Sequence, residues 1–186
     1  MGNGSTADRS TPIQVKGAGG SGNLTGVAQI DGGSEHTCAL LTDESVRCWG
    51  RYNQGELGIG SHADQQYPVQ VDGRGGSGTL ADVGAVSAGR DHTCTLHGDG
   101  TVSCWGRNDR GQLGDGTTTE RTSPIQVVGA GGVGTFTDAF LLSVGWSHAC
   151  SARSADEAWC WGRNNRRQLG DGTTTDRSYP VQVSGI

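Results

Sequence analysis

The chain has 186 residues, of which only 32% are hydrophobic and 34 are glycine, and its formal net charge is −5. The length allows one domain or two small ones. The chain is acidic and has no cluster of basic residues beyond Arg166-Arg167, whereas a nucleic-acid-binding groove normally carries a basic stripe. No apolar run approaches a membrane span, and the residues after Met1 lack the pattern of a signal segment. We therefore expect neither a nucleic-acid partner nor a membrane partner.

The chain opens on residues 1–15, "MGNGSTADRSTPIQV", which match two later stretches, residues 111–127 and 167–183. This surplus segment keeps the alternating apolar positions of a strand, at Ile13 and Val15. A free tail does not need them, so we expect the segment to lie against a blade, either its own neighbour or that of another chain, and our hypothesis is that it docks where subunits meet. The residues assigned to self-association are Ile13, Val15, Val181 and Val183. Deleting residues 2–15 is then expected to lower the assembly state.

The rest of the chain repeats with a step of 56 residues, in units of about 16–71, 72–127 and 128–183, so a single domain spans residues 1–186. Each unit contains a short apolar strand such as "GAVSAG", then "HTCTL", a turn "HGDG", "TVSCWG", a Gly-rich loop and "PIQV". Short β-branched runs between Gly, Asn and Asp predict antiparallel strands, and no segment has a helical period. About four strands per unit predict an all-β fold of propeller blades.

The pattern "CWGRNDRGQLGDGTTT" resembles the RCC1 (regulator of chromosome condensation) repeat in its bacterial form, and the resemblance covers essentially the whole chain. It implies blades of a β-propeller that usually has seven, so the three units here predict about three blades that do not close a ring alone. It also implies the functions found in the family: exchange factors for small GTPases, chromatin binders and protein inhibitors of enzymes. The first unit departs from the pattern at "GELGIGSHADQQYP", and the third has Arg167 where a Gly is usual.

Six cysteines form three Cys-x9-Cys pairs. In a hairpin that turns at residues 98–100, Cys94 lies opposite Cys104, close enough for a disulfide after slight adjustment. We expect disulfides within the hairpins, with reduced buried thiols as the first alternative. The second is an open zinc site of His92, Cys94 and Cys104. The cysteines concerned are Cys38, Cys48, Cys94, Cys104, Cys150 and Cys160.

Repeated aromatic and histidine positions are expected to pack rather than to bind a ligand. A tryptophan at one fixed position of every unit suits packing between blades, and in the resembled family the histidine is buried and hydrogen-bonded. These packing residues are Trp49, Trp105, Trp161, His36, His92 and His148. Trp146 and Trp159 occur only in the third unit and are candidates for a contact surface. The "GDGTTT" loops lack the signature of a calcium or phosphate loop and are interpreted as tight turns. Asn3 and Asn23 begin candidate glycosylation sequons.

No catalytic site is predicted, because no nucleophile motif is present and no His pairs with a Ser or an acid outside the repeat pattern. We expect a non-enzymatic scaffold without cofactor or metal, which self-associates head-to-tail into an oligomer or filament. Disulfides predict an extracellular or cell-surface location. The alternatives are a propeller module that binds a protein partner, or a fragment of a longer repeat protein. Exchange activity on small GTPases is expected to be absent.

Overall fold

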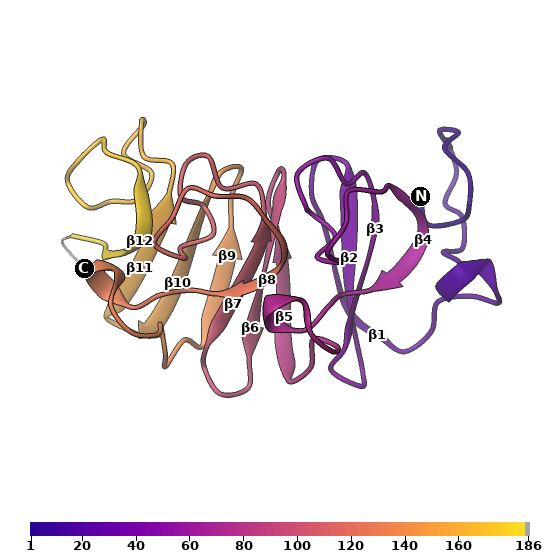
Figure 1. The fold of residues 1–186 in the computed structure, drawn as a ribbon, viewed down its shortest axis with the longest axis horizontal. Helices are drawn as coiled ribbons and strands as arrows, with labels where there is room; N and C mark the ends of the chain where they lie inside the picture. Colours follow the sequence, from indigo (N-terminus) through magenta and orange to yellow (C-terminus); the bar gives the residue numbers. More distant parts are fainter. Residues whose placement is uncertain (185–186) are drawn as a thin grey trace.

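The structure, a computed structural model that describes residues 1–184, contains three antiparallel sheets set side by side along the long axis of the molecule (Figure 1). Each sheet has four strands in chain order and forms one propeller blade. Blade 1 contains β1 (Val27–Gly32), β2 (His36–Leu41), β3 (Val46–Gly50) and β4 (Gln65–Gln70). Blade 2 contains β5 (Val83–Ala88), β6 (His92–His97), β7 (Val102–Gly106) and β8 (Arg121–Gln126). Blade 3 contains β9 (Leu141–Val144), β10 (His148–Ser154), β11 (Glu157–Gly162) and β12 (Arg177–Gln182). The predicted all-β fold of about three blades without ring closure is confirmed.

The central hairpin of each blade follows from strand alternation around a tight turn. In blade 2 the turn comprises residues 98–100, Leu96 lies opposite Val102, and the backbone NH of His97 donates to the carbonyl of Thr101 at 2.9 Å. This is the register that the sequence predicts. It places the two cysteines of each hairpin opposite each other.

A glycine ends the third strand of each blade because any side chain there would clash with the second strand. Gly106 has a φ of 105°, and a Cβ there would lie 2.6 Å from the carbonyl oxygen of Asp91 and 2.7 Å from the Cα of His92. Gly50 and Gly162 have the same conformation, with φ values of 115° and 100°. Only glycine allows the second and third strands to approach so closely at this point.

The "GDGTTT" loops are held by hydrogen bonds within the loop. The carboxylate of Asp115 accepts from the backbone NH of Thr117 at 3.0 Å, from the Nδ2 of Asn108 at 3.0 Å and from the Nε of Arg121 at 2.8 Å. Burial alone would raise the pKa of Asp115, but these bonds outweigh it and lower the pKa. The equivalent Asp171 has a pKa of about 2, where the hydrogen bonds again outweigh burial. The interpretation of these loops as turns is confirmed.

The first unit fills the same loop differently. Tyr52 stands where the other units have an asparagine, is fully buried, and donates from its hydroxyl to the carbonyl of Thr122 at 2.8 Å. Its backbone NH donates to Asp64 at 2.9 Å. The ring therefore replaces the missing Asp-Gly turn and ties blade 1 to blade 2.

A glycine-rich segment precedes each blade, and each of these segments contains one 3-10 turn too short to give a helical period in the sequence. These turns are η1 (Ala18–Gly20), η2 (Arg74–Gly76) and η3 (Ala130–Gly132). No helix in the part of the chain that the structure describes has the length and apolar character needed to cross a membrane.

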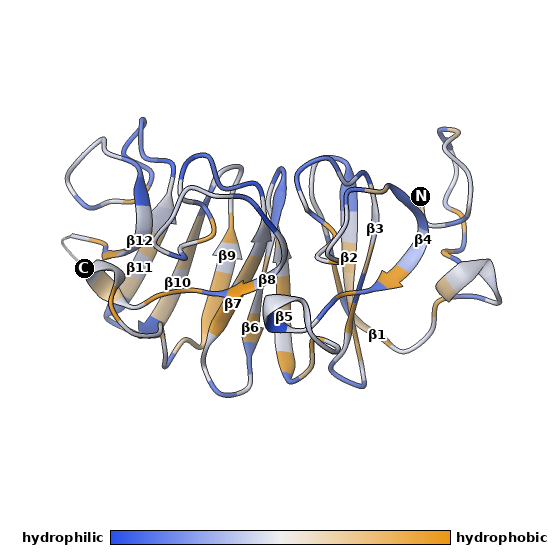
Figure 2. Cartoon of the chain, in the orientation of Figure 1, coloured by the Kyte–Doolittle hydropathy of each residue, from blue (hydrophilic) through white to orange (hydrophobic). Residues whose placement is uncertain are grey.

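The core lies between the blades rather than inside one central body. Apolar residues concentrate within the strands and the loops along one edge are largely hydrophilic (Figure 2). One side of blade 1, including Cys38 and Leu40, packs against Val86 and Trp105 of blade 2, and a second cluster joins blade 2 to blade 3. A third cluster covers the other side of blade 1. The alternation of the strands thus gives every blade two apolar faces.

Candidate protein-binding surfaces

A tryptophan from each blade enters a notch on the element before it. A Cβ on Gly58 would lie 2.9 Å from the Nε1 of Trp105 and 3.0 Å from the Cγ1 of Val71. The indole NH of Trp105 donates to the carbonyl of Glu56 at 2.8 Å. We call the Gly–Val pair that receives the indole the tryptophan notch. Gly114 and Val127 form the second notch, which receives Trp161.

A third tryptophan notch is formed by the surplus segment at the start of the chain. A Cβ on Gly2 would lie 2.8 Å from the Nε1 of Trp49 and 2.9 Å from the Cγ1 of Val15. The backbone NH of Lys16 donates to the carbonyl of Gly2 at 2.9 Å, and that of Leu24 donates to Val15 at 3.0 Å. Residues 1–24 therefore cover blade 1 as a preceding blade would.

The segment was expected to lie against a blade of its own chain or of another, and in this structure Val15 packs with Leu24 against Trp49 of its own chain. Its docking between subunits stays a prediction. Ile13 is half-buried, and residues 9–14 form no strand because no other strand of a preceding blade is there to pair with them. We call residues 1–24 the cap.

The fourth tryptophan notch, on blade 3, is open. The three atoms nearest to a Cβ on Gly170 would all belong to Val183, the first at 2.9 Å, whereas at Gly2, Gly58 and Gly114 a tryptophan is among the nearest. Beside it runs an apolar groove of about 320 Å³, and Leu141 on its edge is 59% exposed. Val181 lies opposite Cys160 and is half-buried. The groove is lined by Leu141, Leu142, Ser143, Cys150, Ser151, Ala152 and Ala158. We call this groove and its notch the open face.

The six cysteines form one opposed pair in the central hairpin of each blade. The structure joins Cys38 to Cys48, Cys94 to Cys104 and Cys150 to Cys160, with 4.1 Å between the Cα atoms of each pair. Within residues 1–184, no group of three His, Cys, Asp or Glu side chains is arranged to hold a metal ion. The pairing in solution stays a prediction.

The three repeated histidines are buried to different extents and differ in their hydrogen bonds. His36 contacts the hydroxyl of Thr93 through Nε2 at 2.8 Å, whereas neither ring nitrogen of His92 has a partner in the structure. The position of Thr93 is taken by Ala149 in the third unit, which explains the difference. Burial lowers the pKa of His36 to about 4 and that of His92 to about 3, and it also lowers the pKa of the half-buried His148.

A polar network in blade 2 was missed by the sequence analysis, which found no His paired with a Ser. His97 Nε2 lies 3.0 Å from the hydroxyl of Ser103, and Nδ1 lies 3.3 Å from the carbonyl of Ala81. Arg74, from the link, donates to Ser103 at 2.9 Å and to Thr101 at 2.7 Å. The clue was that the second unit alone has Arg and His at these two repeat positions.

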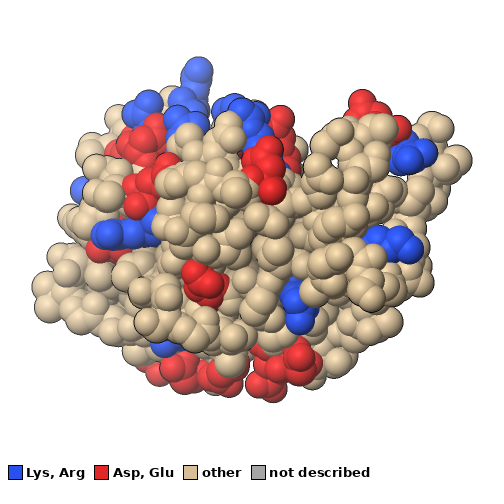
Figure 3. All heavy atoms as spheres, turned by 45° about the vertical axis from the view of Figure 1, so that its right-hand side comes forward, with Lys and Arg blue, Asp and Glu red and all other residues tan. Residues whose placement is uncertain are grey.

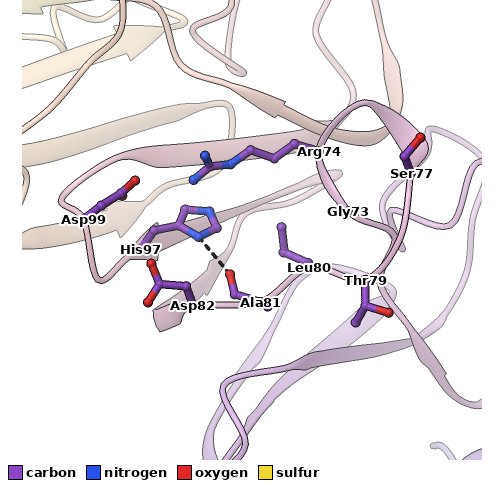
Figure 4. Close-up of a pocket in the computed structure, with 9 residues that line it drawn as sticks. All are labelled: Gly73, Arg74, Ser77, Thr79, Leu80, Ala81, Asp82, His97 and Asp99. Atoms are coloured by element: carbon purple, nitrogen blue, oxygen red, sulfur yellow. Dashed lines mark hydrogen bonds between the residues drawn. The ribbon is translucent and has the colours of Figure 1, made fainter.

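The geometry of this network suits a structural role rather than catalysis. Figure 4 shows Arg74 reaching over His97, with Asp82 and Asp99 beside a pocket of about 320 Å³. Ser103 is fully buried, so a substrate carbonyl has no access to its hydroxyl. Burial, followed by the charge of Arg74, lowers the pKa of His97. The network clamps the link onto blade 2.

The two tryptophans found only in the third unit have different fates. Trp146 is 63% exposed, and the guanidinium of Arg90 lies 4.8 Å from its ring centroid. Trp159 packs into the core between blades 2 and 3, edge-on to Phe136. Only Trp146 is available for contact with another molecule.

The candidate glycosylation positions lie near the cap. Asn23 is exposed, and its backbone bridges to Lys16. Asn3 is half-buried and accepts a hydrogen bond from the backbone NH of Ser5 at 3.2 Å. A glycan at Asn23 has free access to solvent, whereas one at Asn3 competes with this turn.

Family comparison places the same repeat along the chain. Two models of the regulator of chromosome condensation (RCC1) repeat match, one at residues 27–56, 85–112 and 141–168 and the other at residues 43–96, 99–152 and 156–186. Among curated proteins, the ultraviolet-B receptor UVR8 of Arabidopsis thaliana is 29% identical over 189 residues, which cover 100% of this chain and 40% of the receptor. The human E3 ubiquitin-protein ligase HERC2 is 30% identical over 83% of this chain and 3% of the ligase.

Solved structures show the same fold. Yeast RCC1 (Prp20), in a crystal structure with Kap60, superposes with a TM-score of 0.73 at 20% identity over 88% of this chain and 38% of that one. Human WBSCR16 superposes with a TM-score of 0.70 at 22% identity over 85% of this chain and 38% of that one. The chain therefore spans less than half the length of these relatives.

Proposed function

The chain belongs to the RCC1 repeat family, and on that premise we propose that it is a non-enzymatic protein-binding module that self-associates head-to-tail through its blades. The observation that carries the proposal is the open face of blade 3. Its notch, Gly170 and Val183, has the geometry that receives a tryptophan elsewhere in the chain, and the exposed Leu141 extends it. Exposed apolar surface beside a sheet favours association.

The partner that fits the open face is a blade that presents a tryptophan. A second copy of the chain has one in Trp49, next to the buried Leu41 and Ala39. A first blade that meets a third blade is a heterologous contact, which gives rings or filaments according to the rotation between copies. In each free copy, however, the cap covers Trp49, so association requires the cap to leave it.

A second candidate is a different protein partner on the same open face. Solved structures of yeast RCC1 concern its complex with Kap60 and its binding to Gsp1p and histones, which are properties of that protein. Carried to this chain, they support a role as a partner-binding module. Exchange activity on small GTPases is proposed to be absent, and strong acceleration of nucleotide release by the chain would contradict this.

We place the chain outside the cytoplasm, in an extracellular or cell-surface setting. The three hairpin disulfides support this location, because such bonds persist in oxidising compartments. Thiol titration of the chain taken directly from its native source tests the proposal. Six free thiols in that material would contradict it.

Sedimentation velocity over an about hundredfold range of concentration tests self-association. The wild-type chain is expected to sediment faster as its concentration rises. Leu141→Lys places a charge on the open face and should abolish this change. Val133→Lys is the matched control, because Val133 is 78% exposed in the link between blades 2 and 3, away from both faces of the proposed contact.

The outcomes separate the candidates. Loss of association in Leu141→Lys but not in Val133→Lys supports the head-to-tail contact. A monomer at every concentration overturns self-association and leaves a different protein partner as the occupant. Equal loss in both variants would show that association is nonspecific.

A further inference from the structure

Arginines on the loop edge of blades 1 and 2 are neutralised by acids, and the acidic and basic side chains intermingle there (Figure 3). Arg51 pairs with Glu35. Arg107 pairs with Asp91 at 3.2 Å and with Asp109 at 2.8 Å. Each arginine therefore carries its own counter-charge on the same blade.

Blade 3 keeps the arginine at this repeat position and lacks both acids. Arg163 corresponds to Arg51 and Arg107, but Ser147 and Asn165 stand at the acidic positions. Arg163 still donates its backbone NH to the carbonyl of Ser147 at 2.8 Å, so the backbone geometry is that of the other blades. Two further arginines follow at positions 166 and 167. In the described part of the chain, no carboxylate lies within salt-bridge distance of these three guanidinium groups.

The other units have glycine at the position of Arg167. Two features of the structure favour glycine there. The first is conformation: Gly55 and Gly111 both have a φ of 76°, and Arg167 has a φ of 61°, in the left-handed region that costs an arginine free energy. The second is space. A Cβ on Gly111 would lie 2.5 Å from the Cα of Ser178 on the next blade, and one on Gly55 would lie 2.7 Å from the carbonyl oxygen of Arg121.

A second copy that packs on blade 3 therefore cannot approach Arg167 as closely as blade 3 approaches Gly111, so the head-to-tail contact is wider at this one point. An incoming second copy has to yield at the start of its fourth strand, around Gln65. The backbone of Arg167 is strained, and its side chain is exposed. Packing within the chain does not explain an arginine here, but contact with an external anion does.

The exposed Trp146 precedes Ser147, whose backbone carbonyl accepts from the NH of Arg163, so Trp146 and Arg163 lie on the same edge of blade 3. Tryptophan and arginine are the residues most enriched where protein partners bind tightly. We define the arginine rim as Trp146, Arg163, Arg166 and Arg167.

We propose that the arginine rim binds an acidic segment of a partner protein. Guanidinium groups donate paired hydrogen bonds to a carboxylate, and the part of the Trp146 ring that Arg90 leaves exposed offers an apolar contact to a neighbouring side chain of that segment. A protein segment is favoured over nucleic acid, because the chain as a whole carries a net charge of −5 and the rim has only three arginines. This inference goes beyond self-association and does not depend on it.

Fluorescence anisotropy with a labelled octaglutamate peptide tests the proposal. Measurements at about 0.15 M ionic strength limit charge effects to a range of about 8 Å. The wild-type chain should bind the peptide. Arg163→Gln and Arg166→Gln should each weaken binding about three- to tenfold, in keeping with one charge-assisted pair. Arg51→Gln, which removes the paired equivalent in blade 1, is the matched control and should leave affinity within about twofold.

Arg167→Gly guards against loss of binding through misfolding. It should weaken peptide binding and raise the melting temperature, because it removes the strain together with the charge. A structural role would move both quantities in the same direction. The proposal is overturned if the wild-type chain does not bind the peptide, if Arg51→Gln weakens binding as much as Arg163→Gln, or if a single-stranded oligonucleotide of the same charge binds more tightly.

Discussion

At the scale of single residues, His92 is the position where the repeat is least satisfied. Its counterpart His36 contacts Thr93 at 2.8 Å, but Ala149 gives His92 no hydroxyl. Ala149→Thr is expected to raise the free energy of unfolding by about 1 kcal/mol, because it supplies the missing hydrogen bond. Thr93→Ala, which removes the bond from His36, should lower it by about 1–2 kcal/mol. Urea unfolding of both variants measures this, and equal destabilisation by both would contradict it.

The same two histidines predict how stability depends on pH. Burial lowers the pKa of His36 to about 4 and that of His92 to about 3, whereas an unfolded histidine has a pKa near 6.5. Between these values the unfolded chain binds more protons than the folded chain, so the stabilising contribution is full above about pH 6.5 and is lost as the pH falls. The loss at pH 4 is on the order of 3 kcal/mol for each group.

Unfolding at a series of pH values checks this dependence. His92→Leu should flatten the change between pH 6.5 and pH 4, and His62→Gln, at an exposed position, should not. A wild-type chain as stable at pH 4 as at pH 7 would show that these rings are solvated.

Sequence reasoning reached some of these residues and missed others for a physical reason. The opposition of Cys94 and Cys104 depends only on strand period and turn length, which are local. The contact of Arg74 with Ser103 depends on where a glycine-rich link crosses the next blade, and no local pattern fixes that path. The available clue in the sequence was that the second unit alone carries Arg74 and His97 at these repeat positions.

At the scale of elements, the hairpins are the units that the cysteines stabilise. Each disulfide closes a loop with a sequence separation of 10, for which the entropic model gives about 2–3 kcal/mol. Intact mass after alkylation of the native, non-reduced chain should show no modified thiol. Reduction should lower the denaturation midpoint. Six alkylated thiols in the native chain would refute the disulfides.

The strands of each blade were predictable because every unit repeats the same short alternating runs. The cap was recognised as strand-like from Ile13 and Val15, but its destination was not. Val15 forms the same notch whether the Trp49 that enters it belongs to its own chain or to another, so the side-chain pattern is compatible with both. In this structure Val15 and Leu24 pack against Trp49 of the same chain.

At the scale of the whole molecule, the two ends of the row of blades are unlike. Blade 1 presents a tryptophan that the cap covers, and blade 3 presents a notch that no residue of 1–184 fills. The Trp49 face of blade 1, which the cap hides, and the open face of blade 3, which is accessible, are complementary. The sequence led us to expect that deleting the first residues lowers assembly; from this arrangement we propose instead that the deletion raises it, because it uncovers Trp49.

Sedimentation velocity of the chain without residues 2–15, beside the intact chain at equal concentration, tests the central claim most directly. Far-ultraviolet circular dichroism and the count of free thiols verify that the three blades remain folded. The truncated chain is predicted to form larger species, and adding Leu141→Lys to it should return it to the monomer, since the open face is then blocked. A truncated chain that stays folded and monomeric with Trp49 uncovered would contradict the claim that the open face of blade 3 receives the tryptophan face of another copy.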